Sequence, residues 1–183
     1  MGTIGKKIRI EEAKFEFNKL KDLLIPIHCE CDIDNITISG SIRRSKEVDI
    51  GDIDVVLTTL DGNINPNLSA YLIKSGYYID ANGPKLIRML SKEGIQIDIY
   101  SVDESHFPCM MAYLTGPADF NIGMRVVAKR KGMRLNQNSL TKYDSGEEIY
   151  LKSEEDLFNK LGCKYIEPNN RINFYDSLKF NKL

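Results

Sequence analysis

Two aspartates, Asp52 and Asp54, stand one residue apart in the sequence GDIDVVLTT, residues 51–59. They alternate with Ile53 and Val55, which is typical of a β-strand with one buried face, so both carboxylates lie on the other face. Carboxylates held this close repel each other and lose hydration, and a cation or a shared proton makes such a pair tolerable. The alternative is a solvated strand end, where an aspartate pair is common and has no function. The pair alone does not decide between the two interpretations.

A third aspartate, Asp98, lies in the later segment GIQIDIYSV, residues 94–102. Isoleucines alternate there with polar residues at a period of two, which predicts a strand with one face in the core and Asp98 on the polar face. If this strand neighbours the strand of Asp52 and Asp54, the three carboxylates form one wall. Three clustered acids cannot all ionise without a cation, so the sequence indicates a site for divalent cations. A pair of such ions suits in-line displacement at phosphorus.

The elements that would position these residues belong to an α+β fold with a mixed β-sheet. Apolar residues recur at spacings of three and four from Ile10 to Leu24, which predicts an amphipathic helix that ends near Pro26. Further helices are predicted within residues 68–77, 115–132 and 153–162, the last one capped by Ser153. Strands are predicted within residues 35–41, 51–59, 84–92 and 94–102, the last two as a hairpin, and a short pair within residues 134–151.

The charges are distributed unevenly along the chain. The net charge is −1, but residues 29–104 carry thirteen acidic and seven basic side chains, whereas residues 105–183 carry twelve basic and nine acidic ones. This polarity suits a protein that binds cations in one place and a polyanion in another. A chain of 183 residues can form two small lobes. We expect their boundary near residues 102–106, with domains at residues 1–104 and 105–183.

A basic segment at residues 121–142 contains no Asp or Glu. Asn121, Arg125 and Lys129 are spaced four apart and share one face of the predicted helix. A solvated helix face is the usual meaning of such a charge run, but acids are normally interspersed there. The other basic residues of the segment are Arg130, Lys131, Arg134 and Lys142.

Composition and the start of the chain favour an intracellular protein that is not secreted. No apolar run approaches the roughly 18–20 residues of a membrane span, and the opening MGTIGKKIRIEEAKFEF lacks the apolar segment of a signal peptide. Cys29 and Cys31 form a C-x-C pair, while Cys109 and Cys163 stand alone. No zinc-ligand spacing is visible, so we expect four reduced thiols.

Five ordered elements make the chain, from about Ile36 to Arg171, similar to the family X DNA polymerases, the group that includes DNA polymerase beta. The matching elements are Gly40-Ser41-Ile42-Arg43-Arg44, Gly51-Asp52-Ile53-Asp54, Asp98 in IQIDIYS, Tyr113-Leu114-Thr115-Gly116 with Asn121 and Arg125, and Tyr165-Ile166-Glu167-Pro168-Asn169-Asn170-Arg171. A single Gly-Ser followed by Asp-x-Asp is shared by all nucleotidyltransferases, whereas the five in order are specific. The resemblance implies the architecture of the smallest, viral-type members: a nucleotidyltransferase palm and a small α+β C-terminal lobe that binds nucleotide and template.

The resemblance implies catalytic and metal-binding roles for the three acids. Asp52 and Asp54 would bridge two Mg²⁺ ions, with Mn²⁺ as a substitute, and Asp98 would hold the ion that activates the primer 3′-hydroxyl. The phosphates of the incoming nucleotide would be cradled by Gly40, Ser41, Arg44 and Gly51. Arg43 would join them, or is alternatively a structural surface residue.

The resemblance also implies contacts for the C-terminal lobe. The nucleotide's sugar and base would be bordered by Tyr113, Gly116 and Asn121, with Tyr113 as the barrier to a ribose 2′-hydroxyl. Arg125 would reach the template strand through the minor groove, where contacts tolerate any sequence. DNA phosphates would be contacted by Lys129, Arg130, Lys131 and Arg134.

The chain departs from the family pattern at several positions. The spacer between Arg44 and Gly51 is one residue longer than in DNA polymerase beta, and Ile50 replaces a phosphate-binding serine. Leu114 replaces an aromatic residue, and Gln96 replaces a basic residue two positions before the third acid. Only about 35 residues precede the palm motif. We therefore expect no N-terminal lyase domain and no 5′-deoxyribose-phosphate lyase activity.

Together these features predict a template-directed DNA polymerase that transfers a deoxynucleotide from dNTP to a primer 3′-hydroxyl, filling short gaps in base excision repair. The expected partners are gapped or primed DNA, dNTP and, as a further candidate, a DNA ligase. We expect a monomer without membrane contact. Two alternatives stay open: a nucleotidyltransferase that acts on RNA ends or a small molecule, because the aspartate wall is common to both, and a non-catalytic nucleic-acid-binding module.

Overall fold

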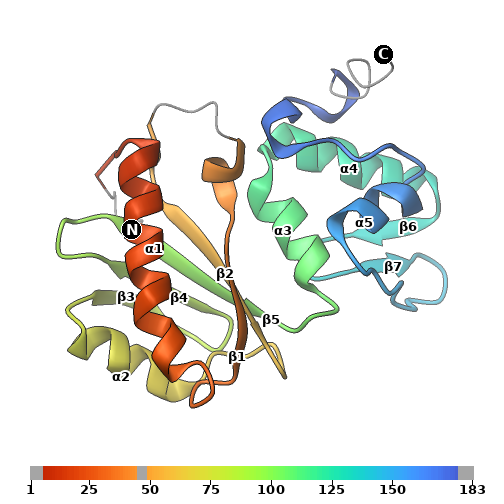
Figure 1. The fold of residues 1–183 in the computed structure, drawn as a ribbon. Helices are drawn as coiled ribbons and strands as arrows, with labels where there is room; N and C mark the ends of the chain where they lie inside the picture. Colours follow the sequence, from red (N-terminus) through yellow and green to blue (C-terminus); the bar gives the residue numbers. More distant parts are fainter. Residues whose placement is uncertain (1–5, 45–48, 177–183) are drawn as a thin grey trace. The chain divides into compact units, whose positions relative to one another are not determined.

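The computed structural model describes residues 6–44 and 49–176. The first residues, used above to judge secretion, and most of the spacer between Arg44 and Gly51 lie outside these ranges. The chain divides into two compact units, residues 1–104 and residues 105–183, which we describe separately (Figure 1). Among the described residues, no helix has both the length and the apolar character needed to cross a membrane.

A mixed five-stranded sheet forms the centre of the first unit. Its strands lie in the order β1-β2-β5-β4-β3. β2 and β5 are parallel, and every other neighbouring pair is antiparallel. The strands are β1 (Ile33–Ile38), β2 (Ile53–Thr59), β3 (Tyr78–Asn82), β4 (Leu86–Leu90) and β5 (Gln96–Val102).

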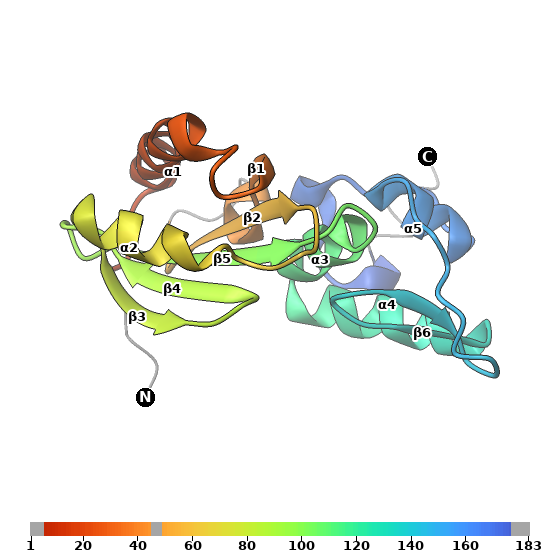
Figure 2. The same ribbon diagram turned by 90° about the horizontal axis from the view of Figure 1, so that it is seen from below.

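Two helices, α1 (Ile10–Leu24) and α2 (Pro66–Lys74), cover one face of this sheet (Figure 2). The stripe that predicted α1 is buried, including Phe17 and Leu20, and packs in one core with Leu68 and Leu72 of α2. Alternate residues of the central strands join the same core, among them Ile53, Val55 and Leu57 of β2 and Ile97 and Ile99 of β5. The residues between them, which include the aspartates, therefore face the opposite side of the sheet.

The second unit packs helices and one short hairpin around aromatic side chains. Phe120, Phe158 and Phe174 are fully buried and contact one another, with ring centroids 5.2 to 6.5 Å apart. The elements are α3 (Phe107–Thr115), α4 (Ala118–Arg130), β6 (Met133–Leu135), β7 (Leu140–Lys142), α5 (Glu154–Lys160) and the 3₁₀ turn η3 (Pro168–Asn170).

A buried arginine, Arg171, ties this aromatic core together. Its guanidinium lies 5.3 Å from the ring centroid of Phe120 and 5.2 Å from that of Phe158. One nitrogen forms an ion pair with Glu154 at 2.6 Å, and Nε donates to the carbonyl oxygen of Ile166 at 2.9 Å. Arg171 was singled out only as part of a sequence motif, and its place here is in the core.

The predicted α+β fold is confirmed in both units. The predicted cap of α5 is also present, since the Ser153 hydroxyl accepts a hydrogen bond from the Asp156 backbone N–H at 3.1 Å. Among the strands and α-helices, β3 and α3 were not predicted. The β5 strand differs in one respect from its expected pattern: its polar face is buried too, with Gln96 6% and Asp98 2% exposed.

Candidate active site

Three carboxylates meet on the sheet face opposite the helices. Because β2 and β5 are parallel neighbours in register, Asp54 lies directly beside Asp98. Asp52 precedes Asp54 by two residues and shares its face. One carboxylate oxygen from each of the three lies within 4.8 Å of the other two. The neighbouring strands that the sequence required for such a wall are therefore present.

Burial and mutual repulsion shift the protonation of this wall. Burial, followed by the charges of Asp52 and Asp98, raises the pKa of Asp54 to about 7, although Arg44 and Arg88 act in the opposite direction. Burial and the charge of Asp98 also raise the pKa of Asp52. The wall thus resists carrying three negative charges by itself. Its all-oxygen donor set and its need for positive charge fit a hard divalent cation.

Asp98 is held by two side chains from the sheet. Arg88 on β4 forms a fork, with Nε 2.8 Å from one carboxylate oxygen and a terminal nitrogen 2.6 Å from the other. The amide nitrogen of Gln96 lies 3.3 Å from the first of these oxygens. Arg88 was not predicted as a functional residue. The available signal was a single basic residue inside the otherwise apolar strand LIRML.

A tight turn brings the chain against Asp54. The 3₁₀ turn η2 (Gly40–Arg44) follows β1, and its first residue, Gly40, has a positive φ of 68°. A Cβ built on Gly40 would collide with the Asp54 carboxylate. Ser41 and Arg44 of the same turn are half-buried, and Arg44 is close enough to lower the pKa of Asp54. Glycine is therefore required for two separate reasons, backbone conformation and space.

We expect Gly40→Ala to displace the Asp54 carboxylate and to weaken the binding of a divalent cation at least about tenfold, because backbone strain of about 1–3 kcal/mol is added to a direct collision. Gly94→Ala is the matched control: Gly94 also has a positive φ, 78°, but nothing lies near its Cβ position. Mn²⁺ affinity and melting temperature are measured for both variants. Equal losses of Mn²⁺ affinity would show that the collision with Asp54 has no role.

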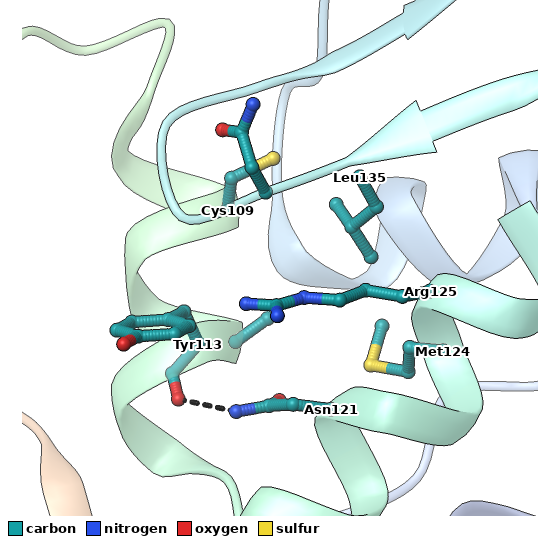
Figure 3. Close-up of a pocket in the computed structure, with 8 residues that line it drawn as sticks. Cys109, Tyr113, Asn121, Met124, Arg125 and Leu135 are labelled. Carbon is teal, nitrogen blue, oxygen red and sulfur yellow. Dashed lines mark hydrogen bonds between the residues drawn. The ribbon is translucent and has the colours of Figure 1, made fainter.

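In the second unit, a small pocket lies between α3, α4 and β6. Its lining includes Tyr113, Asn121 and Arg125 (Figure 3). The Asn121 amide donates to the Tyr113 carbonyl oxygen at 2.7 Å, and the Arg125 guanidinium lies 5.7 Å from the centroid of the Tyr113 ring. Three residues that sequence analysis assigned to sugar, base and template thus surround one pocket. Cys109 and Leu135, which were not assigned, also line it.

The remaining basic residues lie apart from this pocket. Lys129, Arg130, Lys131 and Arg134 are exposed near the end of α4 and on β6, and none of them lines the pocket. The Arg134 guanidinium lies 5.5 Å from the centroid of the Tyr143 ring. Gly51 is exposed beside the acid wall, and Gly116 is buried at the end of α3 with a φ of 53°. The roles given to these residues stay predictions.

Comparisons with known proteins agree on one family. Residues 110–172 match the family model of the DNA polymerase beta thumb. DNA polymerase lambda of Rattus norvegicus is 33% identical over 159 residues, which cover 72% of this chain and 28% of that protein. Repair DNA polymerase X of African swine fever virus (Warthog isolate) is 27% identical over 146 residues, covering 75% of this chain and 82% of the viral protein. The chain belongs to the family X DNA polymerases.

The similarity extends to the fold of a solved structure. A crystal structure of Leishmania infantum polymerase beta in a ternary P/T complex matches with a TM-score of 0.76 at 24% identity, covering 93% of this chain and 78% of that one. The chain spans about a quarter of the length of two curated relatives, 28% of the rat polymerase lambda and 23% of the PolX of Bacillus subtilis.

Two departures from the family X pattern acquire a structural explanation. Ile50, which replaces a phosphate-binding serine, is fully buried, and its backbone pairs with Ile8 through hydrogen bonds of 2.8 and 3.0 Å. Its side chain belongs to the core and cannot grip phosphate. Gln96 stands where the family pattern has a basic residue, and here a guanidinium reaches Asp98 from the neighbouring strand instead, through Arg88.

Proposed function

We propose that the chain is a template-directed DNA polymerase that transfers a deoxynucleotide from dNTP to a primer 3′-hydroxyl and fills short gaps during repair. The observation that carries the proposal is the convergence of Asp52, Asp54 and Asp98, with carboxylate oxygens within 4.8 Å, on two neighbouring parallel strands. Membership of family X, with its match to a polymerase thumb, favours paired DNA as the substrate. A second similar structure, again of Leishmania infantum polymerase beta, is a ternary gap complex, which favours a gap as the place of insertion.

Phosphoryl transfer needs little covalent chemistry from the protein, so positioning and charge account for most of the rate. Asp52, Asp54 and Asp98 would hold two Mg²⁺ ions, which when bound neutralise charge on the triphosphate and lower the pKa of the primer hydroxyl. The η2 turn supplies the phosphate contacts. Gly40 permits close backbone approach, Ser41 offers a hydroxyl, and Arg44 offers a guanidinium fork suited to phosphate oxygens.

The outer wall of the pocket in the second unit, formed by Tyr113 and Asn121, would border the nucleotide's sugar and base. The hydrogen bond from Asn121 to the Tyr113 carbonyl oxygen fixes the amide at the pocket wall. Arg125 is exposed and can leave the Tyr113 ring for a template strand, since a cation over an exposed ring contributes only about 0.5–1 kcal/mol. The exposed basic residues at the end of α4 would contact DNA phosphates and make binding salt-dependent.

Incorporation on a one-nucleotide gap is the decisive test. We expect Mg²⁺-dependent insertion of the nucleotide complementary to the template, and little insertion on single-stranded DNA or RNA. Arg125→Ala should lower templated insertion about 10- to 100-fold, the loss expected for one charge-assisted contact, and should affect dNTP affinity less. Lys164→Ala, which removes an exposed charge from the same unit, serves as the control. Untemplated addition to RNA ends or to a small acceptor would support the alternative nucleotidyltransferase instead.

A further inference from the structure

Arg88 lies directly opposite Asp98, the third of the three acids, on the neighbouring strand. β4 and β5 are antiparallel, and Arg88 pairs directly with Asp98 in their register. The guanidinium uses two nitrogens to contact both carboxylate oxygens, at 2.8 and 2.6 Å. A planar fork bound to a planar carboxylate fixes both its place and its rotation. The Asp98 carboxylate is therefore oriented by a neighbouring strand before any ion is present.

Because Asp98 is buried, this ion pair contributes more to the stability of the site than an ordinary surface ion pair does. The side chain of Asp98 is 2% exposed and that of Arg88 is 31% exposed. The carboxylate end of the pair is therefore largely shielded from bulk water, although the outer part of the guanidinium reaches solvent. Exposed ion pairs contribute little, whereas a buried carboxylate that loses its cationic partner is left with an uncompensated charge.

The same guanidinium places one positive charge inside the acid wall. It contacts Asp98 directly, and carboxylate oxygens of Asp52 and Asp54 lie within 4.8 Å of one of Asp98, so its charge is close to all three aspartates. Divalent ions bind more tightly to a wall of higher net negative charge. A built-in cation consequently limits the affinity of the wall for such ions, while the carboxylate lone pairs that are not used by Arg88 stay available to them.

We propose that Arg88 is a positioning residue of the polymerase site, with two separable effects. Its fork orients the Asp98 carboxylate toward Asp52 and Asp54, and its charge limits how tightly the three carboxylates hold divalent cations. The inference rests on the proposed function, because it assigns Arg88 a part in the same site. Gln96 makes the two effects testable, since its side chain already reaches Asp98 from the same strand at 3.3 Å.

Three variants separate orientation from charge. Arg88→Lys keeps the charge and loses the fork, so we expect Mn²⁺ affinity within about threefold of wild type and a kcat lowered about 10- to 100-fold. Arg88→Gln loses both, so we expect Mn²⁺ to bind about tenfold more tightly while kcat falls at least as far. The double variant Arg88→Gln, Gln96→Arg supplies a guanidinium from position 96. It should return Mn²⁺ affinity to the wild-type range and raise kcat at least about tenfold above Arg88→Gln.

Binding of Mn²⁺ alone is measured by the electron paramagnetic resonance signal of the free ion, without DNA or nucleotide. Incorporation kinetics on gapped DNA then separate kcat from KM, and melting temperatures show which variants fold. Lys74→Gln, which removes an exposed charge on α2, controls for net charge and should change neither quantity.

The outcomes distinguish this inference from the function on which it rests. If the wild-type chain neither binds Mn²⁺ nor incorporates nucleotide, the polymerase assignment and the role of Arg88 are both wrong. If wild type does both and Arg88→Lys keeps the wild-type kcat, the positioning role alone is refuted. An unchanged Mn²⁺ affinity in Arg88→Gln refutes the effect on charge. If Arg88→Gln folds poorly and the double variant has no higher kcat or melting temperature, Arg88 has only a structural role and the positioning role is refuted.

Discussion

Asp54→Asn is expected to lower nucleotide incorporation by at least about a thousandfold and, at the same time, to make the metal-free protein more stable to heat at pH 8. The loss of activity follows from removing one of three carboxylates that converge within 4.8 Å. The gain in stability follows from the same geometry, because the asparagine relieves the repulsion that Asp54 suffers from Asp52 and Asp98. Catalysis and stability thus make opposite demands on this residue.

The pH dependence of this effect has a definite sign. The pKa of Asp54 rises from 3.8 to about 7 on folding, so between these values the folded state binds a proton that the unfolded state has released. Stability of the metal-free wild type therefore contains a component that is full below about pH 4 and is lost as the pH rises toward 7. Asp54→Asn lacks this component. We expect its melting temperature to exceed that of wild type by about 3–8 °C at pH 8 and the difference to shrink at pH 5.

Differential scanning calorimetry in chelator, followed by single-turnover incorporation in Mg²⁺, measures both sides of this prediction. Mg²⁺ should raise the melting temperature of the wild type and leave that of Asp54→Asn nearly unchanged. Asp34→Asn, which changes an exposed aspartate on β1, should behave like wild type throughout. A variant at position 54 that retains more than about a tenth of wild-type incorporation contradicts the catalytic role that phosphoryl transfer by charge stabilisation requires.

Arg171→Met is expected to destabilise the second unit by about 3–5 kcal/mol, the cost typical of breaking a buried ion pair by removing one partner. Glu154 would keep its charge with its side chain only 11% exposed. Methionine fills much of the same volume but offers no hydrogen bond to the Ile166 carbonyl oxygen. It also ends the stacking on Phe120 and Phe158.

Urea unfolding followed by circular dichroism measures this loss. Adding Glu154→Gln to Arg171→Met should restore part of the stability, because it removes the buried negative charge that the Arg171 guanidinium no longer balances. Lys164→Met, at an exposed position of the same unit, should change stability by less than about 0.5 kcal/mol. A loss below about 1 kcal/mol for Arg171→Met would mean that the aromatic core does not depend on its cation.

Local patterns in the sequence were sufficient for the elements that position the acids. The apolar stripe from Ile10 to Leu24 has the helical period, and α1 spans those same residues. β2 and β5 alternate with a period of two, which put Asp52, Asp54 and Asp98 on the correct faces before their strands were known to be neighbours. Turn residues at Gly94 likewise marked the hairpin between β4 and β5.

The elements that escaped prediction lack such a pattern. β3 lies at the edge of the sheet, and most of its residues are exposed, so no buried face repeats along YIDAN. α3 shows the opposite problem, since FPCMMAYLT is buried on nearly all sides and has no polar stripe. The role of Arg88 could not be predicted either, because it depends on strand register, a property that pairs residues ten positions apart in the chain.

The parallel pairing of β2 with β5 makes the acid wall a product of the completed fold. An antiparallel pair could form from one short hairpin, but two parallel neighbours need a crossover, which here consists of residues 60–95 with α2, β3 and β4. Asp52 and Asp54 therefore come close to Asp98 only after residues 60–95 have folded and β5 has paired with β2. Ions that require all three ligands find nothing to bind in partly folded chains, so ion binding selects molecules in which the first unit is fully assembled.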